Sequence, residues 1–103
     1  MSGIERDYGY SYETVAVSQT GQVLGTAGAT GDYIHRLIIS VITVATASVT
    51  IIDGSTSIVI LTGSATLVPG LLSIECNMAS QTGPWKITTG AGATVIAVGV
   101  FSV

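Results

Sequence analysis

The feature that most constrains the fold is a nearly continuous apolar run from Tyr33 to Val44 that is rich in isoleucine and valine. β-Branched side chains lose rotamer freedom in a helix and pack well on a pleated surface, so the run predicts a β-strand. Apolar residues do not alternate with polar ones, which indicates that both faces of this strand are covered. The stretch of highest hydrophobicity, Leu37 to Val49, is interrupted by Ser40, Thr43, Thr46 and Ser48 and is shorter than the roughly 18 to 20 apolar residues of a membrane span, so we expect no membrane anchor.

Turn-forming residues divide the rest of the chain into short segments of the same kind. Asp53-Gly54 predicts a tight hairpin turn rather than a calcium ligand, Pro69-Gly70 predicts another turn, and the three glycines of residues 25–32 predict a loop. With residues 33–44, the strands expected make about eight in all: 14–17, 22–24, 47–53, 57–61, 71–79, 84–89 and 93–103. Many short antiparallel strands without a helical period predict an all-β domain, a β-sandwich that resembles a jelly roll.

The last segment has no polar face. Val95, Ala97 and Phe101 fall on one side of an extended chain, and Ile96 and Val98 fall on the other. A second sheet of the same chain or a neighbouring subunit could cover such a strand. We expect it to be a central strand that closes the domain.

The length of 103 residues predicts one domain with its own core. Residues 1–11 have no apolar period and are expected to form an extended N-terminal arm, while residues 12–103 form the single β-sandwich domain. Tyr8, Tyr10 and Tyr12 alternate, so in an extended arm their rings lie on one side. These rings could cover an edge of the chain's own core or contact a neighbouring surface.

Charged residues are scarce. They make up 9% of the chain against 48% hydrophobic residues, and the formal net charge is −3 with three basic residues, which provides no positive stripe for nucleic acid. The surface must therefore carry mostly hydroxyl, glycine and apolar groups, which is unfavourable for a solitary monomer. We expect part of this surface to be buried against another protein chain.

Residues with catalytic or metal-binding chemistry are few and dispersed. Cys76 is the only cysteine, His35 is the only histidine, and the carboxylates show no ligand spacing, so we expect no metal and no cofactor. His35 is the one candidate base, and a pair with Asp32 is conceivable, but no nucleophile is placed near it. His35 and Arg36 fit a polar strand end whose side chains form hydrogen bonds, either within the chain or across a subunit contact. The chain is not expected to be an enzyme, and its start does not read as a signal peptide.

Trp85 lies beside the turn residues Gly83-Pro84. Such a ring either plugs one end of the sandwich, which we favour, or is exposed as a platform for a sugar. A carbohydrate-binding module is therefore an alternative function.

Three segments carry a resemblance to a family: Ala29–Arg36, Asp53-Gly54 before an Ile/Val strand, and Gly83–Gly90. Together they resemble the small β-sandwich decoration, or cement, proteins that coat the heads of tailed bacteriophages. The resemblance spans roughly Tyr12 to Val103 and is one of size, composition and strand layout, with no diagnostic motif.

The resemblance implies a structural virion protein that forms a homo-oligomer, preferably a trimer, on the capsid surface after assembly in the host cytoplasm. Its partners would be further copies of itself and the major capsid protein, without direct contact to nucleic acid or membrane. A tail or head-fibre base module is a related alternative. The candidate contact residues are Tyr8, Tyr10, Tyr12, His35, Arg36 and Trp85.

Overall fold

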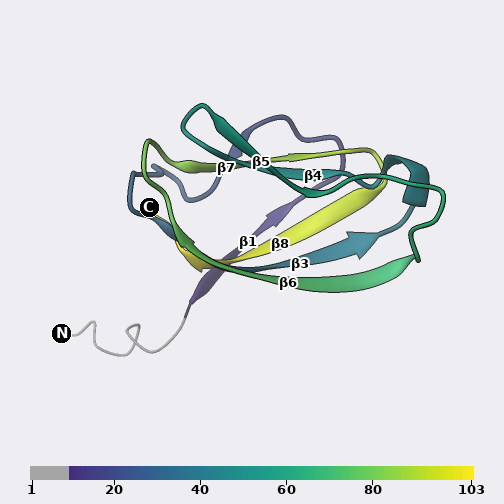
Figure 1. Ribbon diagram of the computed structural model, residues 1–103. Helices are drawn as coiled ribbons and strands as arrows, with labels where there is room; N and C mark the ends of the chain where they lie inside the picture. Colours follow the sequence, from purple (N-terminus) through teal and green to yellow (C-terminus); the bar gives the residue numbers. More distant parts are fainter. Residues whose placement is uncertain (1–9) are drawn as a thin grey trace.

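The structure is a computed structural model that describes residues 10–103, and it consists of two packed antiparallel sheets (Figure 1). Sheet A contains, in spatial order, β1 (Ser11–Val15), β8 (Ala93–Val100), β3 (Tyr33–Val41) and β6 (Gly70–Ala79). Sheet B contains, also in spatial order, β2 (Gln22–Val23), β7 (Trp85–Thr89), β4 (Val49–Asp53) and β5 (Thr56–Leu61). The prediction of an all-β sandwich of about eight antiparallel strands is confirmed.

The order of the strands is that of a jelly roll. β1 pairs with β8, β2 with β7, β3 with β6, and β4 with β5, so the chain forms one long antiparallel ribbon with the β4–β5 hairpin at its tip. The ribbon is rolled up, because β8 also pairs with β3 and β7 also pairs with β4. Two four-stranded sheets with this connectivity define the jelly-roll class of sandwich.

The core lies between the sheets and is built from small and β-branched side chains. Every second residue of the central strands points inward and is buried, as Leu37 and Ile39 of β3 and Val49 and Ile51 of β4 show. Burial of one such side chain contributes about 1.5 to 3 kcal/mol, which makes this layer the main stabilising term. β8 lies between β1 and β3, so the prediction of a central closing strand is confirmed.

The β4–β5 turn forms where Asp53-Gly54 predicts it. Gly54 adopts a left-handed φ of +61°, and Asp53 pairs with Thr56 across the turn. The Asp53 carboxylate accepts hydrogen bonds from the backbone N–H groups of Gln81 (2.8 Å) and Thr82 (3.0 Å). Asp53 therefore ties the hairpin to the turn before β7, and the interpretation as a turn residue is confirmed.

The strand predicted over residues 33–44 is too long. β3 ends at Val41 because the backbone N–H groups of Ile42 and Thr43 both donate to the carbonyl of Gly92, at 2.7 and 3.2 Å. The chain then makes a 3₁₀ turn, η2 (Val44–Thr46), and crosses to sheet B. The predicted arm also overlaps the fold, since Ser11 already belongs to β1, while residues 1–9 lie outside the described residues.

Candidate interaction face

The two central strands of sheet A carry apolar side chains on both faces, but sheet B covers only one of them (Figure 1). Their inward residues are buried, whereas Ile96 and Val100 of β8 point outward with exposed fractions of 37% and 54%. Within residues 10–103, the outward side of the strand at Tyr33 is likewise covered by no second layer, so the prediction that both of its faces are covered is not met by these residues, although its outward side chains are half-buried. No other described element lies over this outward side.

Strand register shows which side chains share the outward side. Tyr12, Val98, Arg36 and Glu75 form one row across β1, β8, β3 and β6. The next row contains Thr14, Ile96, Ile38 and Ser73. We call this surface the outer face of sheet A, and it comprises Tyr12, Thr14, Tyr33, His35, Arg36, Ile38, Leu71, Ser73, Glu75, Asn77, Ile96, Val98 and Val100.

A cluster of aromatic and polar side chains lies at one end of this face. The ring of Tyr10 stacks on His35 with centroids 4.5 Å apart and planes 17° apart. Asn77 Oδ1 lies 2.9 Å from the Tyr33 hydroxyl and 3.0 Å from His35 Nδ1. Because an amide oxygen only accepts, the Tyr33 hydroxyl and His35 Nδ1 both donate to it, so Nδ1 carries a proton in this arrangement. A β-bulge between Ile34 and Arg36 brings these side chains together.

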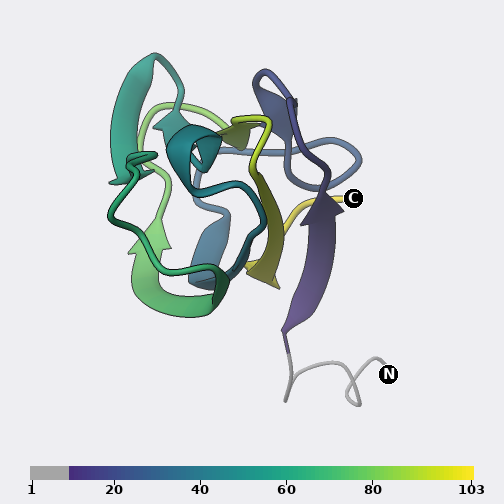
Figure 2. The same ribbon diagram turned by 90° about the vertical axis from the view of Figure 1, so that its right-hand side faces the viewer.

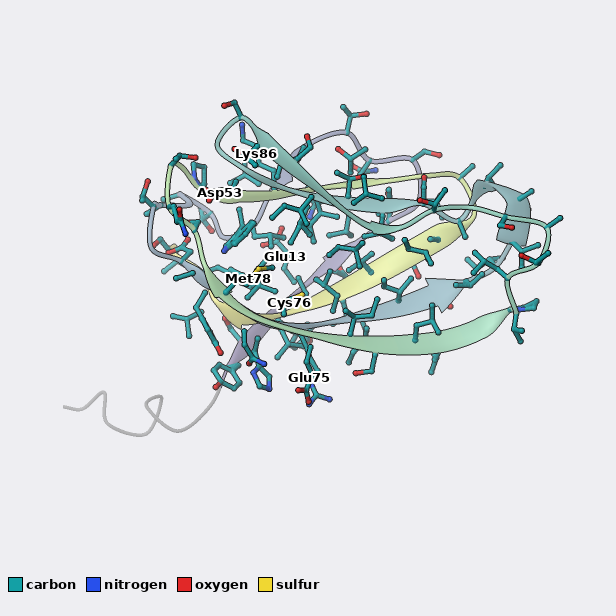
Figure 3. All side chains as sticks on the ribbon, in the orientation of Figure 1. Glu13, Asp53, Glu75, Cys76, Met78 and Lys86 are labelled. Carbon is teal, nitrogen blue, oxygen red and sulfur yellow. The ribbon has the colours of Figure 1, made fainter. Side chains whose placement is uncertain are left out.

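Arg36 and Glu75 form the ion pair of the outer face. Arg36 Nη2 lies 3.4 Å from Glu75 Oε2, and Nη1 lies 3.4 Å from Ser73 Oγ. Both side chains are accessible, so the pair contributes at most about 1 kcal/mol to folding. Figure 3 shows Glu75 pointing away from the sandwich, whereas Cys76 and Met78 of the same strand point between the sheets. The pair is free to interact with a second molecule.

The other charged side chains of the described residues are mostly used inside the fold. Asp32 and Asp53 are buried, and the Glu13 carboxylate accepts hydrogen bonds from Gln22 Nε2 and Gly25 N–H, both at 2.7 Å. This leaves Arg36, Glu75 and Lys86 to face solvent in residues 10–103. The surface is therefore even poorer in charge than the composition indicates.

The candidate contact residues separate into two groups. Tyr12, His35 and Arg36 lie on the outer face of sheet A with Tyr10 beside them, and Tyr8 lies outside the described residues. Trp85 is not part of this surface, because it is 1% exposed and its Nε1 donates to the Asp32 carbonyl at 2.9 Å. Trp85 fills the core, so its interpretation as an exposed sugar platform is wrong.

The conceivable pair of Asp32 and His35 does not form. The Asp32 carboxylate instead accepts from the backbone N–H of Ala29 (3.0 Å) and from the N–H and hydroxyl of Ser102 (2.9 and 2.7 Å). Asp32 therefore holds a loop and the end of the chain together. His35 bonds Asn77, as expected of a polar strand end.

Other chemical features are sparse in the part of the chain that the structure describes. Residues 10–103 contain no cluster of three or more His, Cys, Asp or Glu side chains that could hold a metal ion. Burial raises the pKa of the half-buried Cys76 thiol, which disfavours the reactive thiolate. Among the same residues, no helix has the length and apolar character needed to cross a membrane.

Sequence reasoning identified the apolar side of the last strand with Ile96 and Val98, which a neighbouring subunit could cover, but it did not place that side beside Ile38 on one common face. The sequence signal for this face was that the strands at Tyr33 and Val95 lack a polar side. Only the strand register shows that the uncovered sides of these two strands lie next to each other. No protein-family model, no curated protein and no solved structure matches the chain.

Proposed function

We propose that this chain is a structural protein of a tailed-phage virion, a decoration protein that binds the capsid surface and stabilises it as a homo-oligomer. The observation that carries the proposal is the outer face of sheet A, an almost uncharged sheet surface that residues 10–103 leave uncovered. Its function is to bind protein, without a catalytic step.

The apolar centre of this face supports protein docking. Ile38 and Ile96 are direct cross-strand neighbours, and Val98 lies in the next row. Each apolar side chain that a partner removes from water contributes about 25 cal/mol per Å² buried. Tyr10 and Tyr12 at the margin, with exposed fractions of 50% and 71%, add the aromatic contact area that protein interfaces favour.

The charge distribution argues against the other classes of partner. A nucleic acid would need several phosphate contacts, and Arg36 and Lys86 are the only basic side chains of the described residues. A carbohydrate platform built on Trp85 is incompatible with the burial of that ring. An uncharged sheet face with a single neutralised ion pair fits a permanent protein interface.

The capsid assignment rests on the resemblance to phage cement proteins and on the jelly-roll connectivity, which is common among viral capsid and lectin domains. The major capsid protein is then the partner of the outer face of sheet A, and the host cytoplasm is the place of assembly. The resemblance implies three copies per assembly.

The copy number in purified phage particles tests this role. Quantitative mass spectrometry of virions that carry this sequence should find the chain in numbers comparable with the major capsid protein. A few copies per particle would indicate the tail or head-fibre base instead. Absence from the particle would contradict a virion role.

A single charge on the outer face of sheet A should weaken docking. Val100→Glu places a carboxylate where the partner is apolar, and we expect about a tenfold or greater loss of affinity for phage heads, which corresponds to about 1.4 kcal/mol. Co-sedimentation with heads stripped of the protein measures the loss.

The matched control is Val59→Glu. Val59 is also an exposed strand valine, with an exposed fraction of 64%, but it lies on β5 in sheet B. The control should bind like the unchanged protein, and circular dichroism should show both variants folded. Equal binding by Val100→Glu and the unchanged protein would contradict docking through the outer face of sheet A.

A further inference from the structure

The two sides of the sandwich, where the edge strands of the two sheets meet, differ in chemistry. Figure 2 shows β1 and β2 at one side and β5 and β6 at the other. The β1–β2 side is closed by polar contacts, because the inward carboxylate of Glu13 bonds Gln22 and Gly25. Thr89 Oγ1 further accepts from Gln19 N–H (3.0 Å) and donates to the Ala16 carbonyl (2.6 Å).

The β5–β6 side is open and apolar. All four inward side chains of β6 from Leu72 onwards are only half-buried, and so are those of β5, in contrast to the fully buried inward residues of β3 and β4. The described side chains of β5 and β6 make no hydrogen bond with each other. The half-buried apolar side chains of this side are Ile58, Ile60, Leu61, Leu72, Ile74, Cys76 and Met78.

The backbone edge of β6 is less protected than the edges on the β1–β2 side. Proteins guard an exposed edge with very short strands, charged side chains, proline or β-bulges. β2 is two residues long and β1 carries the inward Glu13, but β6 is ten residues long, its one charged side chain, Glu75, points outward, and its one irregularity is confined to one end. The irregularity of β6 lies near Asn77, so the pairing from Gly70 to Glu75 is regular. This stretch is open to a further strand.

We propose that β6 pairs antiparallel with β6 of a second copy of this chain, about a two-fold axis at Ile74. Sheet A then continues through both copies. Residues whose numbers add up to 148 face each other, so Ile74 faces Ile74 of the second copy and Ser73 faces Glu75 within the regular stretch, while Leu72 faces Cys76 where the irregular part of β6 begins. The pairing satisfies the open backbone edge and brings the two apolar β5–β6 sides together.

Charge complementarity favours this register. On the outward side it places Ser73 opposite Glu75 of the second copy, and Arg36 already reaches Ser73 through Nη1. Each Arg36 therefore lies between its own Glu75 and that of the second copy, and the four charges alternate in sign. The register centred on Glu75 would instead oppose two carboxylates, which is unfavourable in a sheet.

This inference does not depend on the virion role. The two-fold contact uses the edge of sheet A, whereas capsid docking uses its outer face and a three-fold assembly would need a further contact. Binding to heads and pairing in solution are separate measurements, so failure of one proposal is distinguishable from failure of the other.

Charge reversal tests the contact. Sedimentation velocity of the full chain should show a dimer, and Glu75→Arg or Arg36→Glu should each raise its dissociation constant about tenfold or more, because four like charges then surround the axis. The double variant Arg36→Glu/Glu75→Arg restores the alternation and should return to within about threefold of the unchanged protein. Lys86→Glu, on sheet B, should have no effect.

A disulfide tests the register. Directly opposed residues of antiparallel strands have Cα atoms about 4.5 to 5.5 Å apart, within the range of a disulfide. Ile74→Cys in a Cys76→Ser background should therefore give a covalent dimer under mild oxidation. Ile60→Cys in the same background is the matched control, since Ile60 is also half-buried on the β5–β6 side but lies on β5, and it should remain uncrosslinked.

Several outcomes overturn the proposal. They are a monomer at all concentrations, a trimer unaffected by charge reversal, or crosslinking through position 60 in place of 74. Removal of residues 1–9 should leave the dimer intact, and a loss of the dimer in that variant would assign the contact to the arm instead. Circular dichroism of each variant checks that the fold is retained.

Discussion

The two aspartates of residues 10–103 act as hydrogen-bond acceptors that hold loops, and this explains much of the scarcity of charge on the surface of these residues. Asp32 bonds Ala29 and Ser102, and Asp53 bonds Gln81 and Thr82. Fixed N–H and O–H donors of the protein therefore take the place of water as the hydrogen-bond partners of each carboxylate. With Glu13, these aspartates make up half of the six charged side chains of residues 10–103, so little charge is left for solubility.

The Asp53 carboxylate should make stability depend on pH. The hydrogen bond from the Thr82 backbone N–H, opposed by desolvation and reinforced by Gln81, lowers the pKa of Asp53 below its ordinary value. A lowered pKa in the folded state means that the contribution to stability is present above the ordinary value of about 4 and is lost as the pH falls through the folded pKa.

We therefore expect Asp53→Asn to reduce the midpoint of urea unfolding most at neutral pH. The difference from the unchanged protein should narrow as the pH falls below about 4, because the protonated acid then resembles the amide. Parallel titrations of both proteins measure it. A difference independent of pH would mean that ionisation of Asp53 does not stabilise the fold.

Single residues were predictable where local chemistry dominates. The turn at Asp53-Gly54 follows from the conformational freedom of glycine, and the burial of Trp85 follows from its size. The partner of Asp32 was not predictable, because Ser102 is seventy positions away in the chain. The stacking of Tyr10 on His35 likewise depends on how β1 lies relative to β3.

At the scale of the strands, Gly99 controls how β3 and β8 meet. A Cβ atom at this position would collide with the carbonyl oxygen of Tyr33, next to the β-bulge between Ile34 and Arg36. Gly99 is therefore required by close backbone approach, without any left-handed φ.

We expect Gly99→Ala to destabilise the protein by about 2 to 3 kcal/mol, because the two central strands of sheet A must separate locally. Chemical denaturation measures the loss. Gly21→Ala is the control, since Gly21 has φ +59° but open space around it, and it should cost about 1 kcal/mol. If both variants lost the same amount, backbone crowding at Gly99 would not be the cause.

Strand positions followed from the sequence to within a few residues, because runs of valine and isoleucine between glycine and proline turns leave few alternatives. β5 was expected at 57–61 and lies at Thr56–Leu61, and β6 was expected at 71–79 and lies at Gly70–Ala79. Strand pairing could not be predicted, because the residue pattern of β6 alone does not show which strand it pairs with. The interaction face depends on that pairing and was therefore only partly predictable from single residues.

For the whole molecule, the rolled ribbon predicts slow folding. The β1–β8 pair joins segments from opposite ends of the described chain, so loop closure precedes most of the gain in contacts. We expect refolding in milliseconds to seconds, as in other all-β domains. Stopped-flow fluorescence of Trp85, which moves from water into the core, measures it. Complete refolding in microseconds would show that contacts between residues close in the sequence determine the folding rate.

The central place of β8 has a consequence for synthesis in the cell. Sheet A lacks a central strand until Ala93–Val100 has left the ribosome. Until then β1 has no neighbouring strand in the sheet, and β3 has only one of its two. The growing polypeptide therefore exposes apolar strand surface until Ala93–Val100 has been made, a state in which neighbouring nascent chains are prone to stick to one another.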